Sequence, residues 1–170
     1  MRIQSFLSLV LLLALLPGSS GCGYRFSVVG NLPAGIGNIS VRMFENRTSE
    51  TGAEAVFTDA LIAELMRSGV SIAQADSADS ILEGVIESVN VWTVSRRSTQ
   101  VSTERRIGMA VSFKFFNRDG KLLSSGRVQE NQTIWVTANR ATTDAVRLDA
   151  IRRISQRVAE RVNQRLCKNF

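Results

Sequence analysis

The sequence IGMAVSFKFF at residues 107–116 carries the clearest structural signal in the chain. Apolar residues alternate there with small or polar ones, which is the pattern of a strand with one buried face. The apolar set is Ile107, Met109, Val111, Phe113 and Phe115. Residues 117–120, NRDG, follow as a hairpin turn, because Gly120 can take the positive φ that such turns need. Residues 122–136 then form the returning strand.

Two further strands are expected upstream of this hairpin. Residues 81–94 are rich in Val and Ile, with apolar residues on both alternations, which predicts a long strand with both faces partly covered. Near the start, Ile39, Val41 and Met43 alternate with Ser40 and Arg42. That alternation predicts a half-buried strand with one face on the core.

The first predicted helix follows residue 51. Thr51 and Glu54 have the spacing of a capping box, and Gly69 is suited to a left-handed C-cap at the other end. Between them, apolar residues recur at helical spacing, as expected for a helix with one buried face. They are Ala53, Val56, Phe57, Ala60, Leu61 and Leu65.

A second, longer helix is predicted over residues 142–166. Its apolar stripe is Leu148, Ile151, Ile154, Val158, Val162 and Leu166. Another face carries an arginine at every fourth residue, Arg153, Arg157, Arg161 and Arg165. This arginine stripe is either a solvated face or a docking face for acidic groups. The element order is strand, helix, three strands, helix, which predicts an α+β sandwich with the helices on one face of a sheet.

The N-terminal residues predict export and lipid attachment. Arg2 precedes an apolar run at residues 6–16, which is shorter than the ~20 residues that a membrane-spanning helix needs. Small residues then lead to Cys22, so we expect residues 1–21 to be a lipoprotein signal peptide and Cys22 to carry the acyl chains. Because Gly23 and not Asp follows the cysteine, we expect delivery to the outer membrane, on its periplasmic side. Ordinary cleavage beside an unmodified Cys22 is the alternative.

Residues 22–170 are expected to form a single domain. Their net positive charge lies at the end of the chain: residues 22–138 hold 12 basic and 12 acidic side chains, and residues 139–170 hold 8 and 3. Such asymmetry favours an anionic neighbour, and export argues against nucleic acid. The other cysteine, Cys167, has no intrachain partner once Cys22 is acylated, and we expect it to be a buried, inert thiol.

The chain shows no residue set for catalysis. It contains no histidine, which excludes Ser/His/Asp triads, Cys/His pairs and histidine metal sites. The acidic residues form no pair suited to general acid and base chemistry, and no glycine-rich phosphate loop precedes a helix. We therefore expect a protein that is not an enzyme and that needs no cofactor.

Several short motifs, in a fixed order, resemble the lipopolysaccharide-assembly lipoprotein family LptE. They are Gly21-Cys22-Gly23-Tyr24-x-Phe26, Leu32-Pro33-Ala34-Gly35-Ile36 leading into Ile39-x-Val41, Phe44-x-Asn46-x-Thr48-x-Glu50-x-Gly52, Phe57-Thr58-x-Ala60-Leu61-x-x-Glu64-Leu65, and Ala78-Asp79-x-x-Leu82-x-Gly84-x-Ile86. The likeness runs from the lipobox through the final helix. It implies an α+β fold in which two helices pack on one four-stranded, mostly antiparallel sheet, in the order β-α-β-β-β-α.

The resemblance also implies a function. Members of this family plug the outer-membrane β-barrel LptD, help to assemble it, and bind lipopolysaccharide on its way to the cell surface. Basic residues at the tip between the second and third strands and before the last helix contact the lipid, and these places hold Arg96, Arg97 and Arg140 here. Arginine suits phosphate groups because its planar fork binds them bidentately. The alternative is that these three are solvated loop charges.

Three points stay open at this stage. Trp92 and Trp135 occupy strand positions, where burial in the core is the commoner outcome and an interface anchor the alternative. A pilotin-like lipoprotein that escorts another outer-membrane protein, such as a secretin, would share the anchor and the small size. A periplasmic hydrolase with an unrecognised site is a third class, opposed mainly by the missing histidines.

Overall fold

The computed structural model describes residues 32, 35–96, 102–137 and 140–168. Residues 1–21, which we expect to be a signal peptide, lie outside these residues, as do Cys22 and Arg97. The elements in chain order are β1 (Asn38–Val41), β2 (Glu45–Asn46), α2 (Ala53–Arg67), β3 (Ser71–Ile72), β4 (Ser80–Arg96), β5 (Ser102–Asn117), β6 (Leu122–Thr137) and α3 (Arg140–Lys168). The α+β class is confirmed.

The sheet differs from the expected one, since it has six strands and is mixed. Its order is β3-β1-β4-β5-β6, and β2 also pairs with β4. The long strands β4, β5 and β6 are antiparallel, but β1 and β2 run parallel to β4. A helix between two strands returns the chain so that they run parallel, and α2 does this between β1 and β4. The strands β2 and β3 have two residues each, too few for a periodic sequence pattern.

The strands β1 and β2 both pair with β4, and the chain leaves this pairing between them, at residues 42–44. The amide of Arg42 still donates to the carbonyl of Leu82 at 2.9 Å, but that of Phe44 donates to Oγ1 of Thr58 in α2 at 3.1 Å. Phe44 is therefore buried, whereas Met43 is 66% exposed. The expectation that Met43 faces the core is wrong, because the chain leaves the ladder before it.

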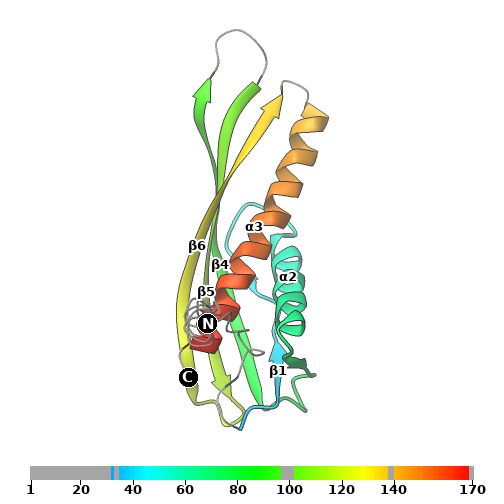
Figure 1. Cartoon of the computed structure of the whole chain (residues 1–170), viewed down its shortest axis with the longest axis vertical. Coiled ribbons are helices and arrows are strands. Elements are labelled where there is room, and N and C mark those ends of the chain that lie inside the picture. Colours follow the sequence, from blue (N-terminus) through cyan, green and yellow to red (C-terminus); the bar gives the residue numbers. More distant parts are fainter. Residues whose placement is uncertain (1–31, 33–34, 97–101, 138–139, 169–170) are drawn as a thin grey trace, which may run out of the picture.

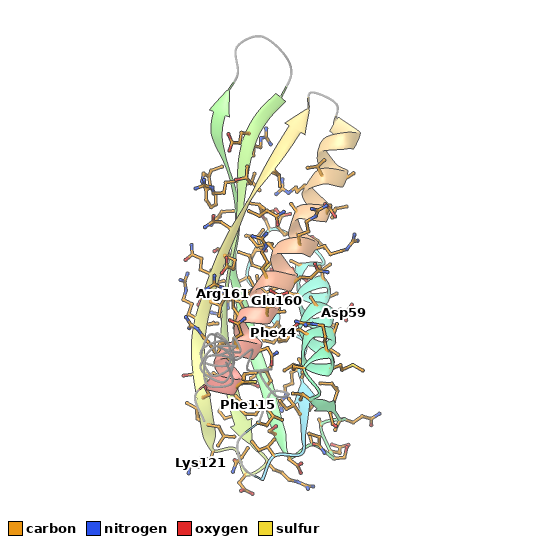
Figure 2. All side chains as sticks on the ribbon, viewed as in Figure 1. Phe44, Asp59, Phe115, Lys121, Glu160 and Arg161 are labelled. Carbon is orange, nitrogen blue, oxygen red and sulfur yellow. The ribbon has the colours of Figure 1, made fainter. Side chains whose placement is uncertain are left out.

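Both helices cover one face of the sheet (Figure 1). The apolar residues of residues 107–115 point toward the helices and lie opposite Leu82 and Ile86 of β4. Phe57 of α2 packs edge-on against Phe44, with ring centroids 4.9 Å apart. Figure 2 shows Phe44 and Phe115 within this core.

The start of α2 differs from the prediction, and its C-terminal end agrees with it. The predicted capping box is wrong: the N-cap is Gly52, with φ 86° and no side-chain cap bond. Instead, Nδ2 of Asn46 donates to Oε2 of Glu54 at 2.7 Å and ties β2 to the helix start. At the other end Gly69 has φ 83°, and the amide of Val70 donates to the carbonyl of Leu65, so the left-handed C-cap is confirmed.

A register shift at Glu87 explains the unusual pattern of β4. Leu82 and Ile86 face the helices before the shift, and Val89 faces them after it. One extra residue in a strand moves the following side chains to the opposite alternation. The apolar residues on both alternations therefore have two causes: the buried face changes its alternation at the bulge, and Ile81 and Val85 on the other face are half-buried.

The two ends of the molecule differ in thickness. The helix α3 has 29 residues and α2 has 15, so only α3 accompanies the far end of the long strands (Figure 1). We call this end the tip, residues 90–96, 102–108, 131–137 and 140–147, and the remainder the base. Leu148, at the border of the tip, is 63% exposed, because it lies beyond the reach of α2. Its assignment to the buried stripe is wrong.

Candidate functional site at the tip

The backbone brings two of the three predicted lipid-binding arginines to the tip. Arg96 is the last residue of β4 and pairs in register with Thr103, and Arg140 is the first residue of α3. The corner between β6 and α3 stands at the same end as the tip of β4 and β5 (Figure 1). The side chains of Arg96 and Arg140, like the whole of Arg97, lie outside the described part. Their contact with lipid stays a prediction.

Two polar side chains that sequence reasoning missed lie between the sheet and α3. Arg105 is opposite Ile134, and Gln132 is opposite Ile107, so both point toward the helix. Nε of Arg105 and Oε1 of Gln132 are buried, and within the described residues neither has a hydrogen-bond partner. An unsatisfied buried polar atom costs ~1–3 kcal/mol, so the tip is less stable here than an apolar layer would be. Extending the alternation backward from Ile107 would have found Arg105.

The first turns of α3 are tied to the base by an ion pair. Nη2 of Arg147 contacts Oε1 of Glu50, in the segment that leads into α2. The carboxylate of Glu50 is mostly buried, and the guanidinium covers it. This contact fixes the angle at which α3 leaves the base toward the tip.

The arginine stripe of α3 is not simply a solvated face, and its docking of acidic groups stays a prediction. Arg161 pairs with Glu130 of β6 at 2.5 Å, and Nη1 of Arg165 donates to the carbonyl of Arg127 at 2.7 Å. Figure 2 shows Arg161 where α3 passes β6. Arg153 pairs with Asp149 one turn away. The contacts of Arg161 and Arg165 hold α3 against β6, and Arg165 occupies a backbone carbonyl of this edge strand, which could otherwise pair with another chain.

The helix-free face of the sheet carries a groove of about 610 Å³ in the base. Its rim includes Met43 and Lys114, and two ion pairs, Arg42 with Glu83 and Arg47 with Glu45, both at 2.9 Å. The hydrogen bond from Arg47 lowers the pKa of the Glu45 carboxyl. Because most of its charges are paired with the opposite sign, the groove is not a strong anion site.

Trp92 lies on the same helix-free face, closer to the tip. Its side chain is 40% exposed, so the expectation of core burial is wrong for this residue. It stands opposite Arg106 of β5. Trp135 pairs in register with Glu104, but its side chain lies outside the described part.

The described residues contain little that suggests catalysis. Burial raises the pKa of the Cys167 thiol, which keeps it protonated and weakly nucleophilic at neutral pH. Among these residues, no cluster of three or more His, Cys, Asp or Glu side chains could hold a metal ion. None of the helices formed by them has the length and apolar content to cross a bilayer.

Comparison with known proteins gives a family and a fold. Residues 36–166 match the family described as LptE, lipopolysaccharide-assembly. A lipoprotein from Caulobacter crescentus CB15 is 17% identical with a TM-score of 0.51, covering 74% of this chain and 88% of its own. Rare lipoprotein B from Shewanella oneidensis is 14% identical with a TM-score of 0.51, covering 72% and 92%. At these identities the solved structures show likeness of fold alone. No curated protein matches the sequence.

Proposed function

Because the chain belongs to the lipopolysaccharide-assembly family LptE, we propose that it is an outer-membrane lipoprotein that plugs and helps to assemble the LptD barrel and binds lipopolysaccharide. The observation that carries this proposal is the family match over residues 36–166, which spans both helices and the whole sheet except for the ends of the chain. The quoted motifs between residues 36 and 86 fall within this match, whereas the one at residues 21–26 precedes it. The protein acts by contact and is not an enzyme.

The anchor in this proposal is Cys22. Acyl chains on the cysteine hold the protein at the periplasmic side of the outer membrane, since each buried methylene contributes about 0.8 kcal/mol. Residues 23–37 separate Cys22 from β1, and 15 residues can reach at most about 50 Å, at about 3.3–3.6 Å per extended residue, so the anchor allows the folded domain to enter a barrel near the membrane. Intact-mass analysis tests the anchor: the mature chain should carry acyl chains on Cys22, and an unmodified N-terminus released into the periplasm would contradict it.

The partner in this proposal is the barrel. A folded domain with several paired surface charges suits a lumen whose wall is polar, because lumen-facing residues of outer-membrane barrels are polar. An affinity pull-down of the lipidated protein from outer membranes should recover LptD. Recovery of a secretin in place of LptD would favour the pilotin-like alternative, and recovery of no barrel would contradict both.

Lipopolysaccharide binding rests on the basic residues of the tip. Arg96, Arg97 and Arg140 are the residues that we propose to contact the lipid phosphates. Arg96→Glu with Arg97→Glu should weaken lipopolysaccharide binding by the purified full chain while its unfolding midpoint stays unchanged. A matched control reverses Arg152 and Arg157, which are exposed on α3 without an ion pair among the described residues. Equal affinity in the two double variants would remove Arg96 and Arg97 from the site.

A further inference from the structure

The indole of Trp92 lies directly against a glycine of the neighbouring strand. A Cβ atom added to Gly108 would stand 2.7 Å from Cη2 and 2.9 Å from Cζ3 of Trp92, so any larger residue would push the ring away. Glycine weakens a strand interior, and it marks places where another group approaches the backbone closely. Gly108 therefore makes room for the indole, which approaches the strand closely and is still 40% exposed.

Residues with hydrogen-bonding side chains are the register neighbours of Trp92 and Gly108 on this face of the sheet. In register, Arg106 lies opposite Trp92 and Thr133 lies opposite Arg106. In the next row, Asn90 and Asn131 flank Gly108. Within the described residues, none of these four polar side chains has a hydrogen bond or an ion pair from its side chain. Two amides, one hydroxyl and one guanidinium are thus available beside a single aromatic surface.

This combination matches the chemistry of a sugar ring. A pyranose has an apolar C–H face, which can lie on an aromatic ring, and a rim of hydroxyls, which need donors and acceptors such as amides and guanidinium groups. A protein partner would need a contiguous apolar centre. Among the described side chains around Trp92, no second large apolar one is exposed, since the others of this kind are Met43, Met66, Leu122 and Leu148. The surface therefore favours a saccharide over a protein.

We propose that Trp92, seated on Gly108 and flanked by Arg106, Asn90 and Asn131, binds a pyranose ring of a glycan. This inference rests on the proposed function, in which the glycan is the saccharide part of lipopolysaccharide. The arginines at the tip and the Trp92 surface then contact two chemically different parts of one molecule. Trp92 is on β4 four residues before Arg96, about 13 Å along an extended strand, which one large glycolipid can span.

The test separates the two parts of the ligand. The full chain is titrated with intact lipopolysaccharide, with lipid A alone, and with the released core oligosaccharide, and binding is followed by calorimetry. Trp92→Ala should weaken oligosaccharide binding about tenfold and leave lipid A binding unchanged. Gly108→Val should have the same effect, because it keeps the indole but displaces it. Lys114→Ala, on the same sheet face in the base, is the matched control and should change neither.

A second readout follows the ring itself. In a Trp135→Phe background Trp92 is the remaining tryptophan, and its emission should change on adding the oligosaccharide. Circular dichroism checks that each variant is folded. Equal oligosaccharide affinity in the wild type and in Trp92→Ala would overturn the inference, as would loss of barrel association in Trp92→Ala with no loss of saccharide. If the wild type binds none of the three ligands, the proposed function has failed as well.

Discussion

The base and the tip of this protein share three strands and one helix, but they are stabilised to different degrees. In the base, α2 and α3 together cover the sheet, and the largest side chains are fully buried. At the tip, α3 alone covers the strands, two polar atoms are buried without described partners, and a tryptophan is exposed on the other face. Stability is not uniform across folds, and binding elements come from the less stable parts. The base maintains the fold, and the tip is available for ligands.

The largest expected effect is in the base. Phe57→Ala removes a fully buried ring that packs on Phe44, so it should lower the free energy of unfolding by ~3–5 kcal/mol. Ile134→Ala at the tip should cost about 2 kcal/mol, because the cavity it leaves can collapse toward a less crowded layer. Urea denaturation measures both. Equal losses would show that the two ends are packed alike.

A smaller effect is expected where α3 is clamped to β6. Arg161→Met leaves Glu130, whose side chain is 16% exposed, without its cation, and should cost ~1–2 kcal/mol. Arg157→Met is the control, since Arg157 has no ion pair among the described residues and should stay within ~0.5 kcal/mol of wild type. Thermal unfolding of both variants measures this. Equal unfolding midpoints would show that the Arg161–Glu130 pair adds no stability and that the stripe is a solvated face.

Apolar substitution of the two buried polar residues at the tip should not lower stability, unlike the substitutions in the base. Arg105→Met with Gln132→Leu replaces the unpaired buried atoms, so stability should stay the same or rise by about 1 kcal/mol. Chemical denaturation checks this. A loss of more than about 2 kcal/mol would mean that both side chains are satisfied by groups that stabilise the tip.

The smallest effect concerns the bulge on the helix-free face. The hydrogen bond from Arg127 lowers the pKa of the Glu87 carboxyl, at 2.6 Å. A carboxyl with a lowered folded pKa stabilises the protein above its unfolded pKa, and this contribution is lost as pH falls through the folded value. Both groups are partly exposed, so Glu87→Gln should cost a few tenths of a kcal/mol at pH 7 and nothing in strong acid. If the difference in unfolding free energy between wild type and Glu87→Gln is the same at pH 7 and in strong acid, the Arg127–Glu87 pair does not contribute to stability.

The sequence patterns predicted what depends on one element and failed where two elements meet. The alternation at residues 107–116 was enough to assign β5 and its buried face. The bulge at Glu87 could not be predicted from the sequence, because one inserted residue moves the buried face of a strand to the other alternation, and apolar residues then occur on both alternations. The exposure of Leu148 depends on where α2 begins, which the helical periodicity of α3 does not contain.

The candidate site was predictable to a similar extent. The arginines at the ends of β4 and α3 came from the resemblance to the family, and the backbone brings Arg96 and Arg140 to one end of the molecule. The helix-facing position of Arg105 could have been predicted, since Arg105 continues the alternation that includes Ile107. The contact between Trp92 and Gly108 could not be predicted, because it depends on the register between β4 and β5. That register is set by how the two strands pair and is not contained in the sequence of either strand alone.

Hydrogen–deuterium exchange of the full chain, with and without lipopolysaccharide, tests most directly whether the tip binds the ligand while the base maintains the fold. Added lipopolysaccharide should slow exchange in residues 90–108 and 131–147, and the core strands and α2 of the base should exchange slowly in both states. Protection that appears in the groove lined by Arg42, Met43 and Lys114, or that is spread evenly over the chain, would contradict this account.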